Sequence, residues 1–344
     1  MIFIDTTKSA NARHRSGLTR VTTRLAAELA NGARSVDWNE AATSCSAEDW
    51  FFTAELFSER ERPGFTGFLA SRRCRTAALF HDAIPLKLPK VTWPQSVARH
   101  PEYMKLLARF DRVFAVSQAS RAELQGFWRW AGVTPTPTVE VLGLGADFSG
   151  EPRARGGRRP SQTLDGARAQ LLCVGILEPR KNQILAIDAA ESLWAQGLNF
   201  DLHFVGRVNP HFGAPIVGRI KAAAKRWRGR VFWHEGATDD ALRALYRSAR
   251  ATLFPTVAEG CGLPLLESLW MGVPCMCSDL PVLRENADAG GCVPVAVNDV
   301  GAWTAAISRV VTDHGYHAEL CNAAEARPLA TWADCARTLR AALA

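Results

Sequence analysis

The stretch VAEGCGLPLLESLWMGVPCMCSDLP, residues 257–281, carries two carboxylates eight positions apart, Glu259 and Glu267. One short apolar run, ATLFP at residues 251–255, precedes the stretch, and a second, VPCMCS at residues 273–278, lies near its end; both have the length and composition of buried strands. Gly262 permits a sharp turn, and Pro264 is favourable in the first turn of a helix because its missing N–H would have no partner there. The stretch therefore predicts strand, turn, helix and strand, the repeating unit of a parallel α/β sheet.

The turn before this predicted helix has the residue types of a ligand site. Backbone N–H groups at a helix start lack acceptors within the helix, so the amides from Gly260 to Leu263 favour oxygen-rich or anionic groups. Glu259, before the turn, and Glu267, one turn into the helix, would accept hydrogen bonds from two sets of hydroxyls. The arrangement fits a nucleotide sugar. A structural glycine turn with a solvated glutamate would account for the same pattern.

A second motif, VGILEPRKN at residues 174–182, brings two cations to a strand end. It places Gly175 at the end of a predicted strand and Arg180 and Lys181 at the start of the next helix. A guanidinium forks across two oxygens and an ammonium supplies a point charge, so the pair can neutralise a diphosphate. A cationic surface loop would have the same sequence.

The alternation of strands and helices runs through the chain twice. An apolar-poor segment rich in Gly, Pro and Arg separates the two runs and reads as a linker or flexible loop. Its Arg cluster also suits nucleic acid, but no aromatic residues interleave it. The predicted fold class is α/β, with two Rossmann-like doubly wound domains facing across a cleft, where ligands bind outside the carboxyl ends of the strands. The predicted organisation has four parts. Residues 1–150 form an N-terminal acceptor-binding domain, and residues 151–169 form a linker or flexible loop. Residues 170–330 form a C-terminal nucleotide-sugar-binding domain, and residues 331–344 form a helix that packs back toward the N-terminal domain.

The strands that the pattern predicts share short apolar runs bounded by polar or glycine residues. They fall at 1–5, 76–82, 110–117 and 138–147 in the first half, and at 169–177, 200–206, 231–234, 251–255 and 273–278 in the second.

Composition limits the class of protein. The chain has 344 residues, of which 47% are hydrophobic and 22% charged, which is typical of a globular protein with more than one domain. Its nine cysteines are odd in number and scattered, which favours buried thiols in a reducing compartment. We expect neither a secretory signal nor a membrane span, since no apolar run approaches the roughly 18–20 residues that a span needs.

The net charge of +7 is unevenly distributed. Residues 1–150 hold 19 Lys and Arg against 15 Asp and Glu, residues 151–169 hold 5 against 2, and residues 170–344 hold 17 against 17. A basic first half favours an anionic partner there, although plain solubility charge would explain the excess equally well.

In this order the motifs resemble the retaining family 4 glycosyltransferases of the GT-B fold, over nearly the whole chain. The stretches GLTRV, LFHDAIPL, AVSQASRAEL and VEVLGLGAD match elements of that family's first domain, and TWADCARTLRAAL matches its last helix. The resemblance departs at Cys261, where an aromatic residue is common, at Ser16-Gly17, where paired glycines are common, and at Leu144-Gly145, where Asn-Gly is common. The first two put the fit of the donor in doubt.

The resemblance implies a role for each matching residue. Glu259 would hold donor-sugar hydroxyls, Glu267 the ribose, and Arg180 with Lys181 the diphosphate, while His81 would lie beside the donor sugar. The catalytic set is thus His81, Glu259, Arg180 and Lys181, and the donor-binding set adds Gly17, Gly175, Gly260, Cys261, Gly262, Leu263 and Glu267. An imidazole at a strand end is also a common structural hydrogen-bond donor, so His81 keeps that second interpretation.

The resemblance also implies the reaction. A hexose, with mannose or a deoxyhexose preferred, would pass from a nucleotide-diphosphate sugar to a glycan with retained configuration. The departing phosphate oxygen would take the acceptor's proton, so the protein mainly positions the substrates and stabilises charge. No acidic D-x-D run is present, so Arg180 and Lys181 would replace a metal, and we expect neither a metal nor another cofactor.

The acceptor prediction rests on the basic first half. Arg13, Arg15, Arg20 and Arg24 cluster early, and tryptophans in KVTWP and GFWRWAG look exposed. Cations with interfacial Trp suit a lipid-diphosphate-linked acceptor and an anionic membrane surface, so we expect a cytoplasmic protein, peripheral at the inner membrane face. Core Trp and solvated Arg would leave the same signature.

Two other classes of function compete with a transferase. A non-catalytic GT-B scaffold would bind a glycan or nucleotide sugar without turnover, but it would not need both glutamates and both cations. A dinucleotide-dependent oxidoreductase would show G-x-G-x-x-G after a first strand, and neither half does. No recognisable nucleic-acid-binding module is present, so nucleic acid is not an expected partner.

Overall fold

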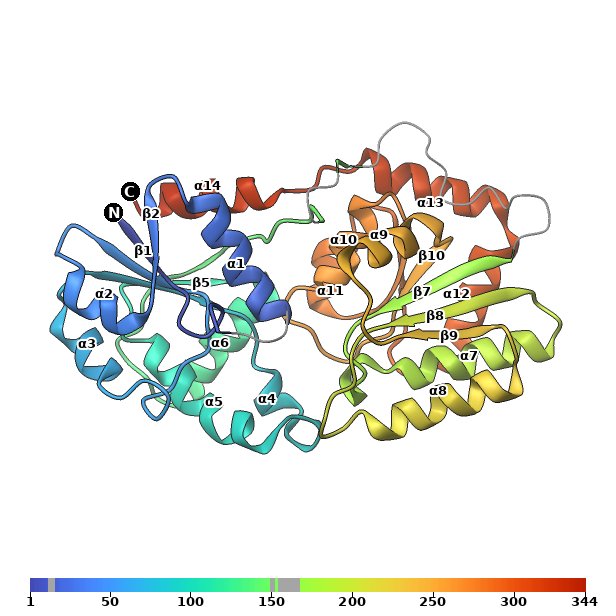
Figure 1. The fold of residues 1–344 in the computed structure, drawn as a ribbon, viewed down its shortest axis with the longest axis horizontal. Coiled ribbons are helices and arrows are strands. Elements are labelled where there is room, and N and C mark those ends of the chain that lie inside the picture. The colour runs from blue at the N-terminus through green and yellow to red at the C-terminus, as the bar shows by residue number, and fades with distance from the viewer. Residues whose placement is uncertain (12–15, 149–151, 154–167) are drawn as a thin grey trace. The chain divides into compact units, whose positions relative to one another are not determined.

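The protein folds into two compact units (Figure 1). The structure, a computed structural model, describes residues 1–11, 16–148, 152–153 and 168–344. Unit 1 comprises Met1–Gly145 and Ala330–Ala344, and unit 2 comprises Ala146–Leu329. Each unit is built on one six-stranded parallel sheet with helices between the strands, which confirms the predicted α/β class.

The sheet of unit 1 has the strand order β2-β1-β3-β4-β5-β6, and all of its pairings are parallel. Strand β3 is buried along its whole length because it lies inside the sheet. The edge strand β2 exposes two of its four residues. The strands are β1 (Ile2–Asp5), β2 (Ala33–Val36), β3 (Trp50–Thr53), β4 (Arg75–Phe80), β5 (Arg112–Ala115) and β6 (Val139–Val141).

The core of unit 1 is rich in aromatic side chains. Phe51 of the sheet packs edge-on against Phe65, Phe80 stacks on Tyr103, and Trp128 belongs to the same cluster. The helices are α1 (Gly17–Leu29), α2 (Trp38–Ser44), α3 (Phe65–Ser71), α4 (Ile84–Lys87), α5 (Pro94–Leu107), α6 (Gln118–Trp130) and α14 (Trp332–Ala342), with a 3₁₀ turn at Pro89–Val91.

The sheet of unit 2 has the order β12-β11-β10-β7-β8-β9, again all parallel. Its central strands β7 and β10 are neighbours although about eighty residues separate them along the chain. The strands are β7 (Ala169–Val174), β8 (Phe200–Val205), β9 (Val231–His234), β10 (Ala251–Phe254), β11 (Cys275–Ser278) and β12 (Cys292–Val295).

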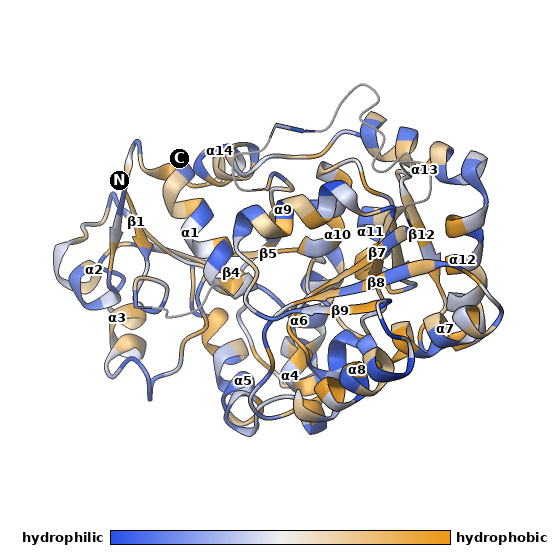
Figure 2. Ribbon diagram, turned by 45° about the vertical axis from the view of Figure 1, so that its right-hand side comes forward, coloured by the Kyte–Doolittle hydropathy of each residue, from blue (hydrophilic) through white to orange (hydrophobic). Residues whose placement is uncertain are grey.

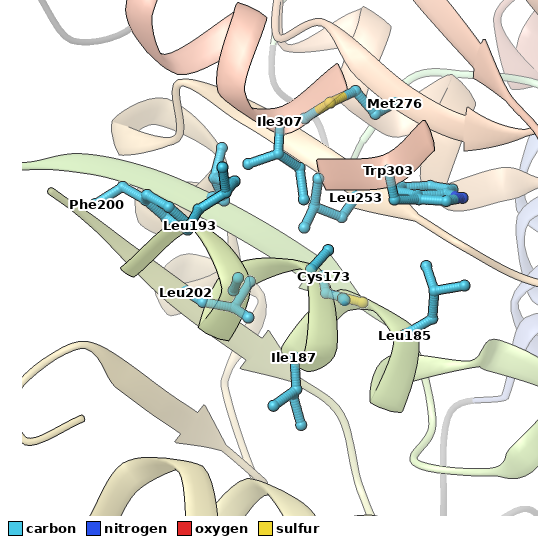
Figure 3. Close-up of a cluster of buried hydrophobic side chains, with 14 of the residues drawn as sticks. Cys173, Leu185, Ile187, Leu193, Phe200, Leu202, Leu253, Met276, Trp303 and Ile307 are labelled. Atoms are coloured by element: carbon cyan, nitrogen blue, oxygen red, sulfur yellow. The ribbon is translucent and has the colours of Figure 1, made fainter. Parts of the chain in front are cut away.

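Helices α7 and α12 pack on each other over one face of this sheet. Figure 3 shows side chains of that core, among them Leu193 of α7, Phe200 and Leu202 of β8, and Trp303 and Ile307 of α12. The helices of unit 2 are α7 (Gln183–Ala195), α8 (Ala214–Arg226), α9 (Asp239–Ser248), α10 (Leu263–Trp270), α11 (Pro281–Ala287), α12 (Val300–Thr312) and α13 (His314–Ala326), with a 3₁₀ turn η2 at Pro179–Lys181.

The hydropathy colours follow these layers (Figure 2). Strand residues are apolar because helices cover both faces of a parallel sheet, while the outer helices alternate polar and apolar faces. All nine cysteines are free thiols, eight of them buried, as predicted. Within the described residues, no helix combines the length and the apolar composition that crossing a bilayer would require.

The segment between the two runs differs from the predicted linker of 151–169 at its edges. Ala169 already belongs to β7, and Arg168 pairs with Asp201 of the neighbouring strand β8 at 2.6 Å. Arg153 donates to the carbonyl oxygen of Ala324 in unit 2. The rest of the predicted linker, residues 151 and 154–167, lies outside the described residues.

Candidate functional site

The two motifs singled out in the sequence meet at the carboxyl ends of β7 and β10. The turn η2 follows β7, and the loop that contains Glu259 follows β10. The amide of Val257 donates to the carbonyl oxygen of Arg180 at 2.9 Å, which ties loop and turn together. Because the two strands are neighbours in the sheet, residues about eighty positions apart come into contact.

Three side chains converge on one oxygen of Glu259. Lys181 Nζ donates to Oε1 at 2.6 Å, Arg180 Nη1 donates at 3.0 Å, and Thr256 Oγ1 lies 2.7 Å away as a donor. Arg180 Nη1 also donates to the carbonyl oxygen of Ala258 at 3.0 Å. The residues predicted for the donor sugar and for the diphosphate therefore form one ion cluster.

A second carboxylate, Glu178 of the motif VGILEPRKN, had no predicted role and fixes the other edge of the Arg180 guanidinium. Arg180 Nε donates to Glu178 Oε1 at 2.9 Å, and Nη2 lies 2.7 Å from the same oxygen. Asn209 Nδ2 donates to Glu178 Oε2 at 3.0 Å and so holds that carboxylate in place. With two cations and two carboxylates, the cluster is formally neutral.

The cluster is only slightly exposed, and this shifts its pKa values. Burial alone would raise the pKa of Glu259, but Lys181, Arg180 and the hydrogen bonds outweigh it, so the pKa lies below its usual range. Burial, followed by repulsion from Arg180, lowers the pKa of Lys181, and Glu259 opposes this shift. The electrostatics therefore hold Glu259 in its ionised form.

Two glycines allow the cluster to sit close to the strand ends. Gly206 has a φ of +153°, and a Cβ there would fall 2.0 Å from the carbonyl oxygen of Gly175. Gly175 has a φ of +150°, and the Lys181 side chain packs over it, 3.6 Å from where a Cβ would be. The Lys181 ammonium also lies 5.0 Å from the centre of the Phe254 ring, a cation–π contact that restrains its stem.

The predicted helix start after Glu259 is α10. Gly262, its N-cap, has a φ of +88°, and a Cβ there would come within 2.6 Å of Leu283 Cδ2. Gly260 and Cys261 are buried, and Asn286 Nδ2 donates to the carbonyl oxygen of Cys261 at 2.9 Å. In the described part of the chain, the amides of Gly262 and Leu263 have no hydrogen-bond acceptor.

Glu267 lies just over one turn into α10, as predicted, and is buried. The hydroxyl of Tyr246 in α9 donates to Glu267 Oε2 at 3.3 Å, and Tyr246 is itself fully buried. Helix α9 thus fixes one edge of the carboxylate. This partner cannot be predicted from the sequence, because nothing in the spacing of α9 links it to α10.

Two predicted site residues belong to unit 1. His81 follows β4 and is buried, with Nε2 2.7 Å from the carbonyl oxygen of Ala54. Burial lowers the pKa of His81, so the ring is neutral and donates from Nε2. Gly17 is the first residue of α1, with no neighbouring atom within 4 Å of where a Cβ would be.

The arginines predicted for an acceptor or membrane face have mixed placements. Arg13 and Arg15 lie outside the described residues. Arg20 and Arg24 are half-buried on α1. Arg24 lies 3.6 Å from Glu28 and 5.9 Å from the centre of the Trp332 ring, so it takes part in the packing of α1 against α14.

Comparison with known proteins places the chain among glycosyltransferases. Residues 157–327 match the family described as glycosyl transferases group 1. Serotype-specific mannosyltransferase WbdA of Escherichia coli is 31% identical over 246 residues, which cover 68% of this chain and 29% of WbdA. O-antigen chain mannosyltransferase B of Escherichia coli is 26% identical over 296 residues, covering 78% of this chain and 70% of that protein.

Among solved structures, the crystal structure of Anabaena Alr3699/HepE in complex with UDP and glucose has a TM-score of 0.76 at 14% identity, covering 99% of this chain and 98% of HepE. This likeness concerns the fold alone. The match spans less than a third of WbdA, whereas it spans most of mannosyltransferase B. From the order of its motifs, its two sheets and these matches, we conclude that the chain belongs to the glycosyl transferases group 1 family and has the GT-B fold.

Proposed function

We propose that the protein is a retaining glycosyltransferase of the family 4 type that acts in polysaccharide biosynthesis. It transfers a hexose, with mannose preferred, from a nucleotide-diphosphate sugar to a glycan or lipid-linked acceptor at the cytoplasmic face of the membrane. The observation that carries the proposal is the ion cluster of Glu259, Arg180 and Lys181 at the ends of β7 and β10. The names of the mannosyltransferase relatives support the choice of sugar.

Glu259 is the proposed clamp for the donor sugar. The three donors within the described residues that reach its carboxylate converge on Oε1. This leaves Oε2 to accept a hydrogen bond from a sugar hydroxyl. Because Lys181, Arg180 and Thr256 fix the carboxylate before substrate arrives, the bond to the hydroxyl costs little reorganisation.

Arg180 and Lys181 are the proposed stabilisers of the leaving diphosphate. The bond from the anomeric carbon to the phosphate oxygen breaks, and the acceptor oxygen forms its bond on the same face. The acceptor's proton passes to the departing phosphate oxygen, so atoms and charges balance without a protein base. The unoccupied amides of Gly262 and Leu263 add partial positive charge at the start of α10.

Glu267 is the proposed ribose ligand. Its carboxylate is held by Tyr246 on one edge and lies in the second turn of α10. His81 would contact the donor sugar as a neutral ring, since its lowered pKa excludes a permanent positive charge at neutral pH. Neither role requires a cofactor, and we propose that the reaction needs no metal.

A panel of nucleotide sugars, with GDP-mannose first, tests the proposal. We expect one donor to bind and to be hydrolysed slowly without acceptor, and the released sugar to keep its anomeric configuration by NMR. Activity should persist in EDTA. Loss of activity in EDTA and recovery with Mg²⁺ or Mn²⁺ would overturn the metal-free part of the proposal. Donor binding with no turnover under any condition would favour the alternative, a non-catalytic scaffold.

A further inference from the structure

Unit 1 carries an apolar depression that none of the proposed donor or acceptor residues explains. It has a volume of about 570 Å³, and six residues of α4, α5 and α6 line it. Helix α5 packs against both α4 and α6. We call this surface the Trp130 patch; its members are Leu86, Pro101, Lys105, Gly126, Phe127 and Trp130.

The patch is anchored to the core yet presents a large side chain to solvent. Leu86 and Phe127 pack against the core of unit 1, whereas Trp130 is 83% exposed. The rings of Phe127 and Trp130 lie 6.0 Å apart. The sequence predicts that both tryptophans of GFWRWAG are exposed, but Trp128 is buried in the core of unit 1, where its Nε1 donates to the carbonyl oxygen of Met104. Trp130 therefore turns most of its side chain to solvent and touches the rest of unit 1 beside Phe127.

The segment that carries the patch has an excess of positive charge. Residues 84–131, which contain all of its members, hold eight Lys and Arg against three Asp and Glu. Lys105 lines the depression, and Arg129 Nη2 lies beside it, 3.9 Å from where a Cβ on Gly126 would be. Within the described residues, Lys90, Lys105 and Arg129 have no ion-pair partner, whereas Lys87 is paired with Glu123.

We propose that the Trp130 patch docks the protein on an anionic lipid bilayer. An indole is stable at the boundary between headgroups and acyl chains, and Phe127 and Leu86 would follow it to the apolar side. Lys105, Arg129 and Lys90 would lie at the level of the lipid phosphates. A soluble anion would match the cations but not the apolar depression, and an uncharged apolar partner would not need the cations.

The inference rests on the proposed function for its purpose, which is to bring the enzyme to a lipid-linked acceptor. It adds a second contact with the membrane to the one predicted at Arg13, Arg15, Arg20 and Arg24, of which Arg24 lies 5.9 Å from the centre of the Trp332 ring of α14. Membrane docking is measured without a donor or an acceptor. A failed glycosyltransferase assay would therefore count against the proposed function alone, and a failed docking assay would count against the Trp130 patch alone.

The test is sedimentation of the full chain with vesicles of phosphatidylcholine containing about one third phosphatidylglycerol, at low and high salt. We expect binding at low salt that weakens at high salt and is absent with pure phosphatidylcholine. Trp130→Ala should weaken binding about tenfold with an unchanged melting temperature, because the side chain is exposed. Lys105→Glu with Arg129→Glu should weaken it at least tenfold by a separate route.

The matched control is Lys221→Glu with Lys225→Glu, which makes the same charge change on two exposed residues of α8 and should leave binding within twofold. Equal loss in the control would show that only overall charge matters and would overturn the assignment to this patch. Vesicle binding by Trp130→Ala equal to that of the wild type would overturn the assignment as well. The wild type could instead fail to bind anionic vesicles but self-associate, and Trp130→Ala could abolish that self-association. In that case a second copy of the chain, and not a bilayer, occupies the Trp130 patch.

Discussion

Lys181, Arg180 and Thr256 all donate to a single oxygen of Glu259, and this concentration of donors changes what a substitution there should do. A glutamate in a turn would, from sequence alone, matter little for folding. In the structure it neutralises two cations that are at most one fifth exposed. Removing it leaves both without that partner in a poorly solvated place.

We therefore expect Glu259→Ala to lower turnover at least 10²-fold and to lower stability by about 1–3 kcal/mol. Glu259→Gln should keep most of the stability, since the amide oxygen can still accept from Lys181, but should lose comparable activity. Donor turnover and chemical denaturation measure the two effects. Wild-type turnover by a folded Glu259→Ala protein would remove the residue from the mechanism.

Glu178 offers a sharper test, because it contacts Arg180 but is not proposed to contact substrate. Glu178→Gln adds one positive charge to a neutral cluster and weakens the hydrogen bonds that hold one edge of the guanidinium, because a neutral amide oxygen replaces a carboxylate oxygen. We expect nucleoside diphosphate to bind about three- to fivefold more tightly while kcat falls about tenfold, because attraction increases and the guanidinium is positioned less firmly. Isothermal titration and steady-state kinetics give the two numbers.

Glu319→Gln is the control for this pair of measurements, since it makes the same charge change at an exposed position of α13. Glu319→Gln should change neither the affinity for nucleoside diphosphate nor kcat. Changes of the same sign in affinity and kcat for Glu178→Gln would argue against a positioning role.

Buried histidines give the protein a predictable response to acid. Burial is the largest cause that lowers the pKa of His81, His100, His203 and His317. The unfolded chain therefore binds protons near pH 6.5 that the folded chain does not, so stability is full above that pH and is lost as the pH falls below it. We expect the denaturation midpoint to decline steadily from pH 7 to pH 5. An unchanged midpoint over this range would mean that these rings are protonated without cost.

At the scale of elements, the sequence predicted those strands that are continuous apolar runs. Strands β1, β4 to β6 and β7 to β11 were found for that reason. Strand β3 was missed, although every residue of WFFT is buried, because acidic residues on both sides shorten the run. Strands β2 and β12 were missed because their partly exposed edge positions mix polar and proline residues among the apolar ones.

The site shows the same division between local and long-range information. Glu259, Glu267, Arg180 and Lys181 occur in local motifs that a sequence displays. Their partners do not: Asn209 and Tyr246 reach the site from other elements, and no spacing along the chain reveals that. Packing of neighbouring strands, which brings distant residues together, is what the sequence pattern does not specify.

The glycines of the strand ends give a prediction for β7 and β8. Gly206→Ala would place a methyl 2.0 Å from the carbonyl oxygen of Gly175 at an unfavourable φ, so the two strand ends must separate. We expect a loss of about 2–4 kcal/mol in stability and a loss of donor binding.

Gly218→Ala, inside α8 with no atom within 4 Å of the new methyl, is the matched control and should gain about 0.5–1 kcal/mol. Thermal denaturation and nucleotide titration of both variants decide the point. If Gly206→Ala changed neither stability nor donor binding, the close approach of the ends of β7 and β8 would not be needed for either.

At the scale of the whole molecule, the chain crosses twice between its units, after Gly145 and after Leu329. Helix α14 lies at the end of the sequence but packs on α1, in unit 1. Trp332 is almost fully buried, and a Cβ on Gly145 would fall 2.3 Å from the Trp332 nitrogen. Arg340 also donates to the carbonyl oxygen of Asn31 at 2.6 Å.

Removal of residues 330–344 should therefore destabilise unit 1 and spare unit 2, because the lost helix covers the apolar side of α1 and contributes nothing to the core of unit 2. Calorimetry of the truncated chain should show one transition at lower temperature and one unchanged, and the unchanged one should still rise with added nucleoside diphosphate. Trp332→Ala, which keeps the helix and deletes its largest buried side chain, should lower the same transition by about 3–5 kcal/mol. Removing Ala344 alone should have a much smaller effect, since that residue is exposed and lies beyond the helix, which ends at Ala342. If truncation lowered the nucleotide-responsive transition instead, α14 would be part of the fold of unit 2, and the division of the chain into these units would be wrong.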